Sequence, residues 1–256
     1  MRTWVLLRGL ARQSGHWGSF VDALQAALPG DRIVTLDLPG TGRHRDLPSP
    51  LRVEQLLAHC RDQLRACGER PPFHVIGMSL GGMVTAAWLT EHAEDLAGAV
   101  LINSSLRPLS PWHQRLRPGA WWPLLCSLLA RDAQRSESRI LQVTSNRPEQ
   151  RRRVLAYWTM LRREQAVTDL DSLKQLWAAA RFRLHEGTPK PPVLLLCSRG
   201  DRLVHPDCSR ALARRWQCAL AEHPDAGHDL ALDEAGWVVA RIVQQFGSAR
   251  QEAPAV

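Results

Sequence analysis

The sequence predicts an α/β protein in which a mostly parallel sheet is flanked by helices. Short, almost continuously apolar runs alternate along the chain with segments of helical periodicity, a pattern typical of a parallel sheet covered on both faces. The chain has 256 residues, of which 45% are hydrophobic and 23% are charged. That length and composition are typical of a globular protein with one sizeable core.

The predicted strands are apolar runs that end in glycine or other turn residues. Six such runs occupy residues 3–9, 32–40, 73–78, 96–103, 192–198 and 218–223. In open parallel sheets the reactive groups lie on loops beyond the carboxyl ends of the strands. The loops after these runs are therefore where candidate site residues are expected.

The predicted helices lie between these strands and carry apolar residues at helical spacing. In the first, Trp17, Phe20, Leu24 and Leu28 recur on one face, and Pro29-Gly30 ends the pattern. The helical segments of the core are 16–28, 53–68, 80–91, 205–216 and 234–246.

Residues 105–190 break the alternation and are interpreted as a helical lid inserted after the fourth predicted strand. Helical patterns occupy 123–134, 150–165 and 169–184. The segment holds 16 Lys and Arg against 7 Asp and Glu, a net charge of +9, while the other residues hold 17 against 18. The expected division is a core of 1–104 and 191–246, the lid, and a flexible tail at 247–256.

Composition excludes several classes of protein. No run of about 18 apolar residues predicts a membrane span, and Arg8 interrupts the N-terminal apolar stretch, which argues against a secretory signal. The six cysteines form no CxxC pair and lack zinc-ligand spacing with histidines. We therefore expect a cytoplasmic protein with no disulfide framework, no metal and no cofactor.

Ser79 is the candidate nucleophile. Residues 77–82 read Gly-Met-Ser-Leu-Gly-Gly, so this serine stands in G-x-S-x-G where a predicted strand passes into a helix. Such a nucleophile elbow exposes the hydroxyl above the sheet. Side chains at Gly77 and Gly81 would collide with the neighbouring helix and strand.

The acid and base of a catalytic triad are expected after the last two strands. A serine hydroxyl needs a base that an acid orients. Asp201 follows the fifth strand, and His228 lies on the loop before the last helix, which gives the order Ser, Asp, His. Asp207 is a less favoured acid, because it lies one helical turn beyond Asp201. The alternative histidines are His223, inside a predicted strand, and His205, at a helix start. An acid after the fourth strand is excluded, since Asn103-Ser104 stand there.

Two backbone amides are candidates for the oxyanion hole. The amide of Leu80 lies at a helix N-terminus, where the helix dipole assists an anion. The amide of Leu10 follows Gly9, which allows close approach of the backbone to a substrate.

These motifs resemble those of α/β-hydrolase-fold serine hydrolases over nearly the whole chain. The turn at 37–42, DLPGTG, is also similar to one common in that family, and in it Asp37 is expected to fix the turn. The short core, the GMSLGG elbow, the helical lid and the later Asp and Gly-His motifs are most similar to bacterial carboxylesterases of the pimeloyl-carrier-protein methyl ester esterase type. One departure is Arg8, where many relatives carry histidine.

The resemblance implies ester cleavage through an acyl-enzyme, with a small-molecule or acyl ester as substrate. Thioester cleavage remains open. An acidic carrier protein is a candidate partner for the basic lid, with docking expected at Arg151, Arg152 and Arg153. Arg8 is expected to bind an anionic substrate group or to point to solvent. Candidate substrate contacts, besides Arg8, are Trp112, Trp121 and Trp158.

Two other classes of function are less favoured. A non-catalytic binding module of the same fold would not need a complete triad. Nucleic-acid binding is not expected, because the sequence has no nucleic-acid motif and its lid arginines interleave with core-spaced apolar residues. The alternative for the basic lid is a solvated helical face.

Overall fold

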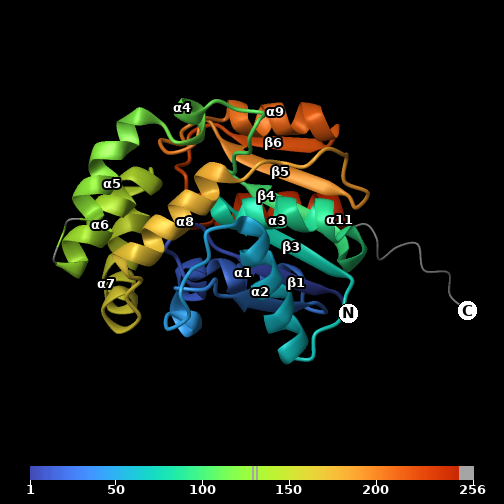
Figure 1. Cartoon of the computed structure of the whole chain (residues 1–256), viewed down its shortest axis with the longest axis horizontal. Helices are drawn as coiled ribbons and strands as arrows, with labels where there is room; N and C mark the ends of the chain where they lie inside the picture. Colours follow the sequence, from blue (N-terminus) through green and yellow to red (C-terminus); the bar gives the residue numbers. More distant parts are fainter. Residues whose placement is uncertain (129, 131, 248–256) are drawn as a thin grey trace, which may run out of the picture.

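A six-stranded parallel sheet forms the centre of the computed structural model, which describes residues 1–128, 130 and 132–247 (Figure 1). The spatial order is β2-β1-β3-β4-β5-β6, and every pairing is parallel. The predicted sheet is therefore confirmed. The strands are β1 (Thr3–Leu7), β2 (Arg32–Leu36), β3 (Phe73–Met78), β4 (Leu96–Ile102), β5 (Val193–Ser198) and β6 (Ala219–His223).

Both faces of the sheet are covered by helices, because alternate strand residues point to opposite sides. Val5 and Leu7 of β1 belong to one buried cluster, with side chains of α2 (Val53–Ala66), α3 (Leu80–Glu91) and α9 (Asp207–Trp216). Trp4 and Leu6 belong to the other, with α1 (Phe20–Ala27), α10 (Leu230–Asp233) and α11 (Ala235–Phe246). Burial on both faces explains why the strands are almost continuously apolar.

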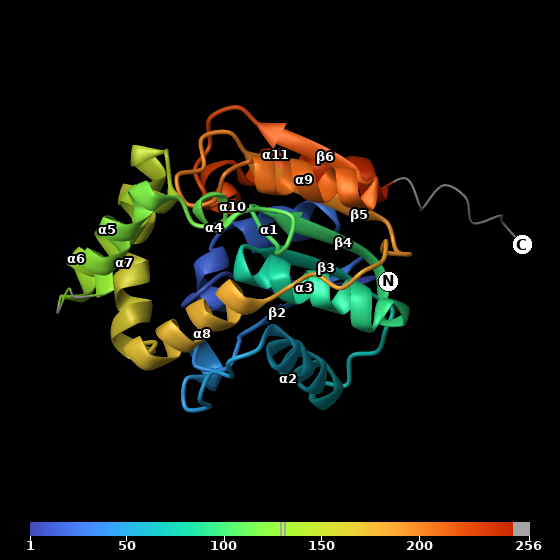
Figure 2. The same ribbon diagram turned by 45° about the horizontal axis from the view of Figure 1, so that its top comes forward.

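The segment between β4 and β5 forms a group of helices at one end of the sheet, to the left in Figure 1 and again in Figure 2. Its elements are α4 (Trp112–Arg115), the 3-10 turn η4 (Pro118–Ala120), α5 (Trp121–Leu128), α6 (Ala133–Thr144), α7 (Pro148–Glu164) and α8 (Asp169–Arg181). Trp158 and Leu161 of α7 pack with Leu141 of α6 and Leu232 of α10. We refer to α4–α8 as the lid helices.

Two expected helices differ from those observed. The expected helix 16–28 is divided into a 3-10 turn, η1 (Ser14–Trp17), and α1, because Gly18 between them has a positive φ of 50°. The expected helix 123–134 contains the end of α5 and the start of α6. Asp132 caps α6 by accepting from the amide of Arg135 at 2.8 Å, so a helix begins there. The tail expected at 247–256 lies, beyond Gly247, outside the described residues.

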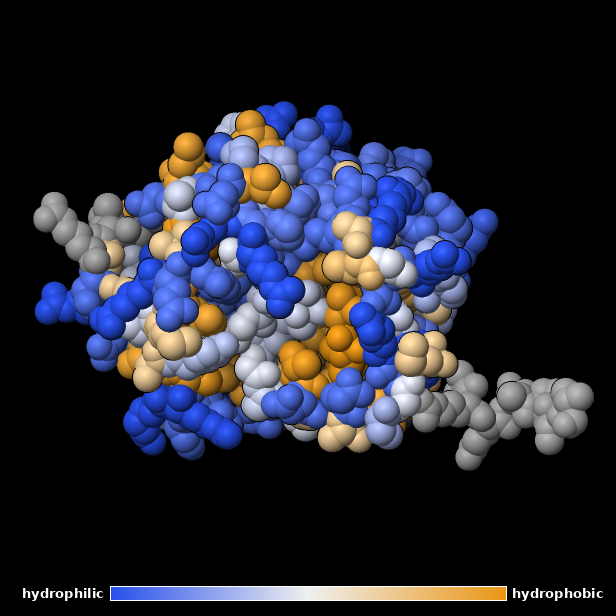
Figure 3. All heavy atoms as spheres, turned by 90° about the horizontal axis from the view of Figure 1, so that it is seen from below, coloured by the Kyte–Doolittle hydropathy of each residue, from blue (hydrophilic) through white to orange (hydrophobic). Residues whose placement is uncertain are grey.

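Hydrophobic side chains reach the surface mainly on the lid helices. Of the thirteen large hydrophobic residues that are exposed within the described chain, ten belong to 112–177. Figure 3 shows hydrophobic residues, in orange, as separate patches among hydrophilic ones, some at the left and others right of centre. No helix in the described ranges has both the length and the apolar character needed to cross a bilayer.

Candidate active site

Ser79 occupies a strained turn between β3 and α3. Its φ of 55° and ψ of −114° are uncommon for a residue with a side chain. A Cβ at Gly77 would overlap Thr85 Oγ1 and the Gly81 carbonyl, and one at Gly81 would overlap the carbonyl oxygen of Leu7. The two glycines thus allow β3, α3 and β1 to approach closely enough to form the turn, as expected from the sequence.

Asp201 and His228 form a buried pair. His228 Nδ1 lies 2.7 Å from Asp201 Oδ2, and the two side chains are 6% and 1% exposed. A carboxylate accepts hydrogen bonds, so Nδ1 carries the proton and Nε2 of the neutral ring is left as a proton acceptor. The other carboxylate oxygen, Oδ1, accepts from the amides of Leu203 (2.7 Å) and Val204 (2.9 Å).

The alternative acid and bases have other partners. Asp207 is partly exposed and pairs with Arg210 at 2.9 Å, and His205 Nδ1 lies 3.3 Å from the same aspartate. His223 Nδ1 accepts from the amide of Ala226 at 3.1 Å at the end of β6. These contacts favour Asp201 and His228 over their alternatives.

Ser79 and His228 come from strand ends on either side of β4. The amide of Ser79 donates to the carbonyl of Ile102 at 2.9 Å, and the next residue, Asn103, donates from Nδ2 to the carbonyl of His228 at 2.8 Å. Within the described residues Ser79 Oγ makes no hydrogen bond. Catalytic hydrogen bonds without substrate are often long, so this geometry is compatible with a serine that His228 activates when substrate binds.

The amides of Leu10 and Leu80 donate no hydrogen bond to another residue in the part of the chain that the structure describes. A Cβ placed on Gly9 would lie 3.1 Å from Ser79 Cβ and 3.6 Å from Ser79 Oγ, so the loop after β1 runs directly beside the serine. Leu80 opens α3, where the first amides have no acceptor within the helix. Both amides are therefore available to an oxyanion near Ser79.

Arg8 does not point to solvent, contrary to one expectation. It is 3% exposed and pairs with Asp229, through Nη1 at 3.1 Å and Nη2 at 2.5 Å. Its guanidinium also lies 4.9 Å from the centre of the Trp17 ring. Because a bidentate carboxylate already occupies the guanidinium, Arg8 ties the loop after β1 to the residue that follows His228.

The lid residues that the sequence proposed for substrate binding are scattered. Trp158 is 1% exposed and lies on the buried side of α7, against His16 at 4.9 Å between ring centres. Trp112 and Trp121 are 64% and 47% exposed, and their ring centres lie 5.4 Å apart with the planes tilted by 36°. Their ring contacts are thus to each other rather than to the candidate triad.

The three arginines proposed for docking lie on the first half of α7. Arg152 and Arg153 are exposed and Arg151 is half-buried. A groove of about 210 Å³ between α6 and α7 is lined in part by Arg151 and Arg152. The basic face is therefore accessible.

Several residues that hold this site in place were not singled out in the sequence. Asp233 accepts from Ser145 Oγ at 2.5 Å, Asn146 N at 2.8 Å and Gly227 N at 2.7 Å. Burial raises the pKa of this carboxyl, although all three hydrogen bonds oppose that rise. It fastens the link between α6 and α7 to the loop of His228. In the sequence, Asn103 indicated only that no acid follows the fourth strand. In the structure it holds the loop of His228 from the end of β4.

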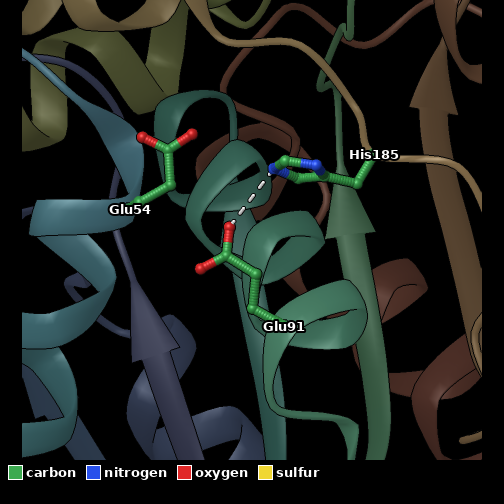
Figure 4. A group of neighbouring side chains, drawn as sticks. All are labelled: Glu54, Glu91 and His185. Carbon is green, nitrogen blue, oxygen red and sulfur yellow. Dashed lines mark ion pairs between the residues drawn. The ribbon is translucent and has the colours of Figure 1, made fainter.

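One other group of side chains has the composition of a metal site. Glu54, Glu91 and His185 place ligand atoms within 4.8 Å of one another, and His185 Nε2 lies 3.6 Å from Glu91 Oε1 (Figure 4). Glu91 and His185 are exposed, and Glu91 lies at the opposite end of α3 from Ser79. The contact is that of a surface ion pair, which contributes little to stability.

A comparison with protein families gives the classification. The model of the alpha/beta hydrolase family matches residues 4–241. The chain belongs to this family. Among its relatives is a protein of Cronobacter sakazakii named as a carbamate hydrolase, RutD, which is 29% identical over 212 residues, or 81% of this chain and 76% of the relative. A protein of Pongo abelii named as a protein-lysine deacylase, ABHD14B, is 35% identical over 101 residues, or 38% of this chain and 46% of that protein.

Solved structures of other alpha/beta hydrolases have the same fold. The enol-lactonase of Burkholderia xenovorans superposes with a TM-score of 0.76 at 20% identity, over 96% of this chain and 91% of that one. An esterase of Thermogutta terrifontis gives 0.70 at 19% identity, over 97% and 90%. The α/β-hydrolase fold expected from the sequence is confirmed. As a member of this family, the protein is a hydrolase.

Proposed function

We propose that this alpha/beta hydrolase is a serine carboxylesterase that works through an acyl-enzyme. The observation that carries the proposal is the buried contact of 2.7 Å between His228 and Asp201, formed on loops at the same edge of the parallel sheet as the strained turn of Ser79. A pair of that kind leaves Nε2 ready to accept the serine proton.

In the proposed reaction Ser79 Oγ forms a bond to the ester carbonyl carbon while its proton moves to His228 Nε2. The amides of Leu10 and Leu80 donate to the oxyanion. The C–O bond to the alcohol then breaks, and the leaving oxygen takes the proton from His228. A water molecule then gives a proton to His228 Nε2 as its oxygen forms a bond to the acyl carbon. The bond from that carbon to Ser79 Oγ breaks, Oγ takes the proton back from His228, and the acid is released.

The test is a panel of p-nitrophenyl esters graded by acyl length. The wild-type protein should hydrolyse at least one, and Ser79→Ala should lower kcat by about 10⁴-fold or more, because serine and histidine act as a unit. An unchanged melting temperature would show that the fold is intact. Full activity of the variant would mean that another residue is the nucleophile. A carbamate belongs in the same panel, because of the similarity to RutD.

A carrier-linked ester or thioester is the second candidate substrate. The net charge of +9 on residues 105–190 and the exposed arginines of α7 favour an acidic carrier protein as partner. This substrate class corresponds to the pimeloyl-carrier-protein methyl ester esterases that the motifs resemble. A serine nucleophile can attack the carbonyl of an ester or of a thioester. The two reactions are distinguished by comparing hydrolysis of a carrier-linked ester with hydrolysis of the matching carrier-linked thioester.

A non-catalytic module of the same fold is the third candidate, and the buried acid-base pair makes it the weakest. A cytoplasmic location is part of the proposal, supported by six cysteines that are all free thiols.

A further inference from the structure

Buried hydrogen-bond donors without an acceptor gather beside the proposed oxyanion loop. In the described chain eleven buried side-chain nitrogen or oxygen atoms have no partner, and five of them come from one neighbourhood. These are Arg8 Nε, Arg12 Nη2, His16 Nε2, Trp17 Nε1 and Trp158 Nε1. All five residues are at most 8% exposed. Because buried donors are almost always satisfied in folded proteins, such a concentration indicates a ligand.

Three of these residues are in contact through Trp158. The guanidinium carbon of Arg12 lies 4.7 Å from the centre of the Trp158 ring, and the His16 ring lies 4.9 Å from it. Arg12 and His16 come from the loop after β1, whereas Trp158 comes from α7. These three residues, which we call the cluster, therefore lie between the proposed oxyanion loop and the lid helices.

Each of the three has a hydrogen left to donate. Arg12 uses Nη1 for Glu137 Oε2 at 2.7 Å, which leaves Nη2. The amide of Gln13 donates to His16 Nδ1 at 3.2 Å, and the Gln13 carbonyl lies slightly further from it, at 3.3 Å. In the tautomer of His16 that accepts this amide hydrogen bond at Nδ1, the neutral ring carries its proton on Nε2. The indole of Trp158 is a donor only.

The electrostatic balance favours an anion. The guanidiniums of Arg8, Arg12 and Arg162 face the carboxylates of Asp229 and Glu137, which leaves one positive charge in excess. The pKa of His16 lies well below its usual range, because the ring is buried and because Arg12, Arg8 and Arg162 disfavour its charged form. A neutral His16 donates to an anion without adding a further buried charge.

The cluster is one turn of chain away from the candidate nucleophile. The amide of Arg12 donates to the carbonyl of Gly9 at 3.2 Å, and Gly9 is the residue that lies beside Ser79. The loop that carries Arg12 is therefore the loop that passes Ser79, which allows one molecule to contact both residues.

We propose that Arg12, His16 and Trp158 form a subsite for a carboxylate carried by the substrate, which makes the favoured substrate a monoester of a dicarboxylic acid. The proposal rests on the esterase function proposed above and names its substrate class. Because Trp158 belongs to α7 and the other two side chains belong to the loop after β1, the carboxylate would bind between these two elements.

The test compares two p-nitrophenyl esters with acyl chains of equal length, the monoester of glutaric acid and the pentanoate. In the wild-type protein kcat/KM should be at least about tenfold higher for the charged ester, the effect of one charge-assisted hydrogen bond. Trp158→Phe keeps an aromatic ring, although a smaller one, and removes the donor, so the ratio should fall several-fold. The control Trp177→Phe changes an exposed tryptophan that also stacks with an arginine, Arg181, and should keep the ratio.

A second variant addresses Arg12. Arg12→Met alone would leave Glu137 paired only with Arg162, so it is combined with Glu137→Gln. The double variant should lose the preference for the charged ester while a thermal melt confirms that it folds. If it keeps the wild-type preference, the carboxylate binds elsewhere.

A binding measurement separates this proposal from the esterase function. In the Ser79→Ala protein, titration calorimetry should give at least about tenfold tighter binding of the glutaric monoester than of the pentanoate. If the wild-type protein hydrolyses neither ester, the full ester panel decides the esterase function and this binding measurement decides the subsite. Equal binding of the two esters would overturn the subsite.

Discussion

Asn103 connects the strand ends on which the candidate catalytic residues lie. Its Oδ1 accepts from the amide of Ser198 at 2.9 Å, and its Nδ2 donates to the carbonyl of His228 at 2.8 Å. Its φ of 47° turns the chain out of β4, in a region that asparagine adopts more readily than most residues. We infer that Asn103 is a positioning residue that fixes the loop of His228 relative to Asp201.

Two substitutions at Asn103 separate the backbone from the amide side chain. Asn103→Gly keeps the positive φ and removes both hydrogen bonds, so kcat on a p-nitrophenyl ester should fall about 10- to 100-fold, from a loss of about 1.4–2.7 kcal/mol. KM should change little, because the amide does not contact substrate. Asn103→Ala adds backbone strain and should also lower the melting temperature. If Asn103→Gly keeps the wild-type kcat, Asn103 is not a positioning residue.

At the residue scale, the candidate triad could be proposed from its order along the chain. Each candidate follows a recognisable strand, so the elbow motif and two strand ends were sufficient. The partner of Arg8 could not be predicted from the sequence. Asp229 lies 221 positions away, and only the folded sheet brings the two residues together. The roles of Asn103 and Asp233 likewise depend on loops that meet only in three dimensions.

At the element scale, the packing of α3 against β1 determines how Ser79 is presented. Gly81 is the point of closest approach, since a Cβ there would overlap the Leu7 carbonyl and lie 2.7 Å from that of Arg8. The backbone of β1 leads into the loop of Gly9 and Leu10. A shift of α3 therefore moves the serine relative to the proposed oxyanion donors.

Two glycine substitutions test this packing. Gly81→Ala should force α3 away from β1 and lower the free energy of unfolding by about 1–3 kcal/mol, the usual effect of overpacking a core. Gly236→Ala, in α11 where an added Cβ meets nothing within 4 Å, should instead raise it by about 0.5–1 kcal/mol. Urea denaturation of both variants measures the difference. Equal stability of the two would show that α3 does not approach β1 as described.

The elements of the core were predicted more accurately than those of the lid. The ranges of β3 and α3 agree with the sequence at both ends, because the elbow motif marks the junction. The short helices α4 and α10 were missed, since four residues carry too little periodicity to indicate a helix.

At the scale of the whole molecule, the lid helices combine positive charge with exposed hydrophobic side chains. Residues 105–190 carry the whole net charge of the chain, and Leu170, Leu173 and Trp177 of α8 are at least half exposed. A surface that is both basic and apolar suits an acidic protein partner. The sequence predicted the charge, but it could not predict which hydrophobic side chains would be exposed to solvent.

Charge reversal tests the docking of a carrier. Changing Arg151, Arg152 and Arg153 to Glu should lower kcat/KM on a carrier-linked ester about tenfold or more at low salt, and the loss should shrink as salt is added. The matched control reverses three exposed arginines of the core, Arg70, Arg214 and Arg215, and should stay near the wild-type value. Equal loss in both proteins would indicate general electrostatics rather than a docking face.

The central claim is that Ser79 is a nucleophile activated by His228, and covalent labelling tests it most directly. Wild-type protein treated with a fluorophosphonate should gain one adduct, and peptide mapping should place it on Ser79. Ser79→Ala should gain none, and His228→Gln should react at least about 100-fold more slowly, since the general base is lost. An adduct on another residue, or equal labelling of all three proteins, would contradict the account.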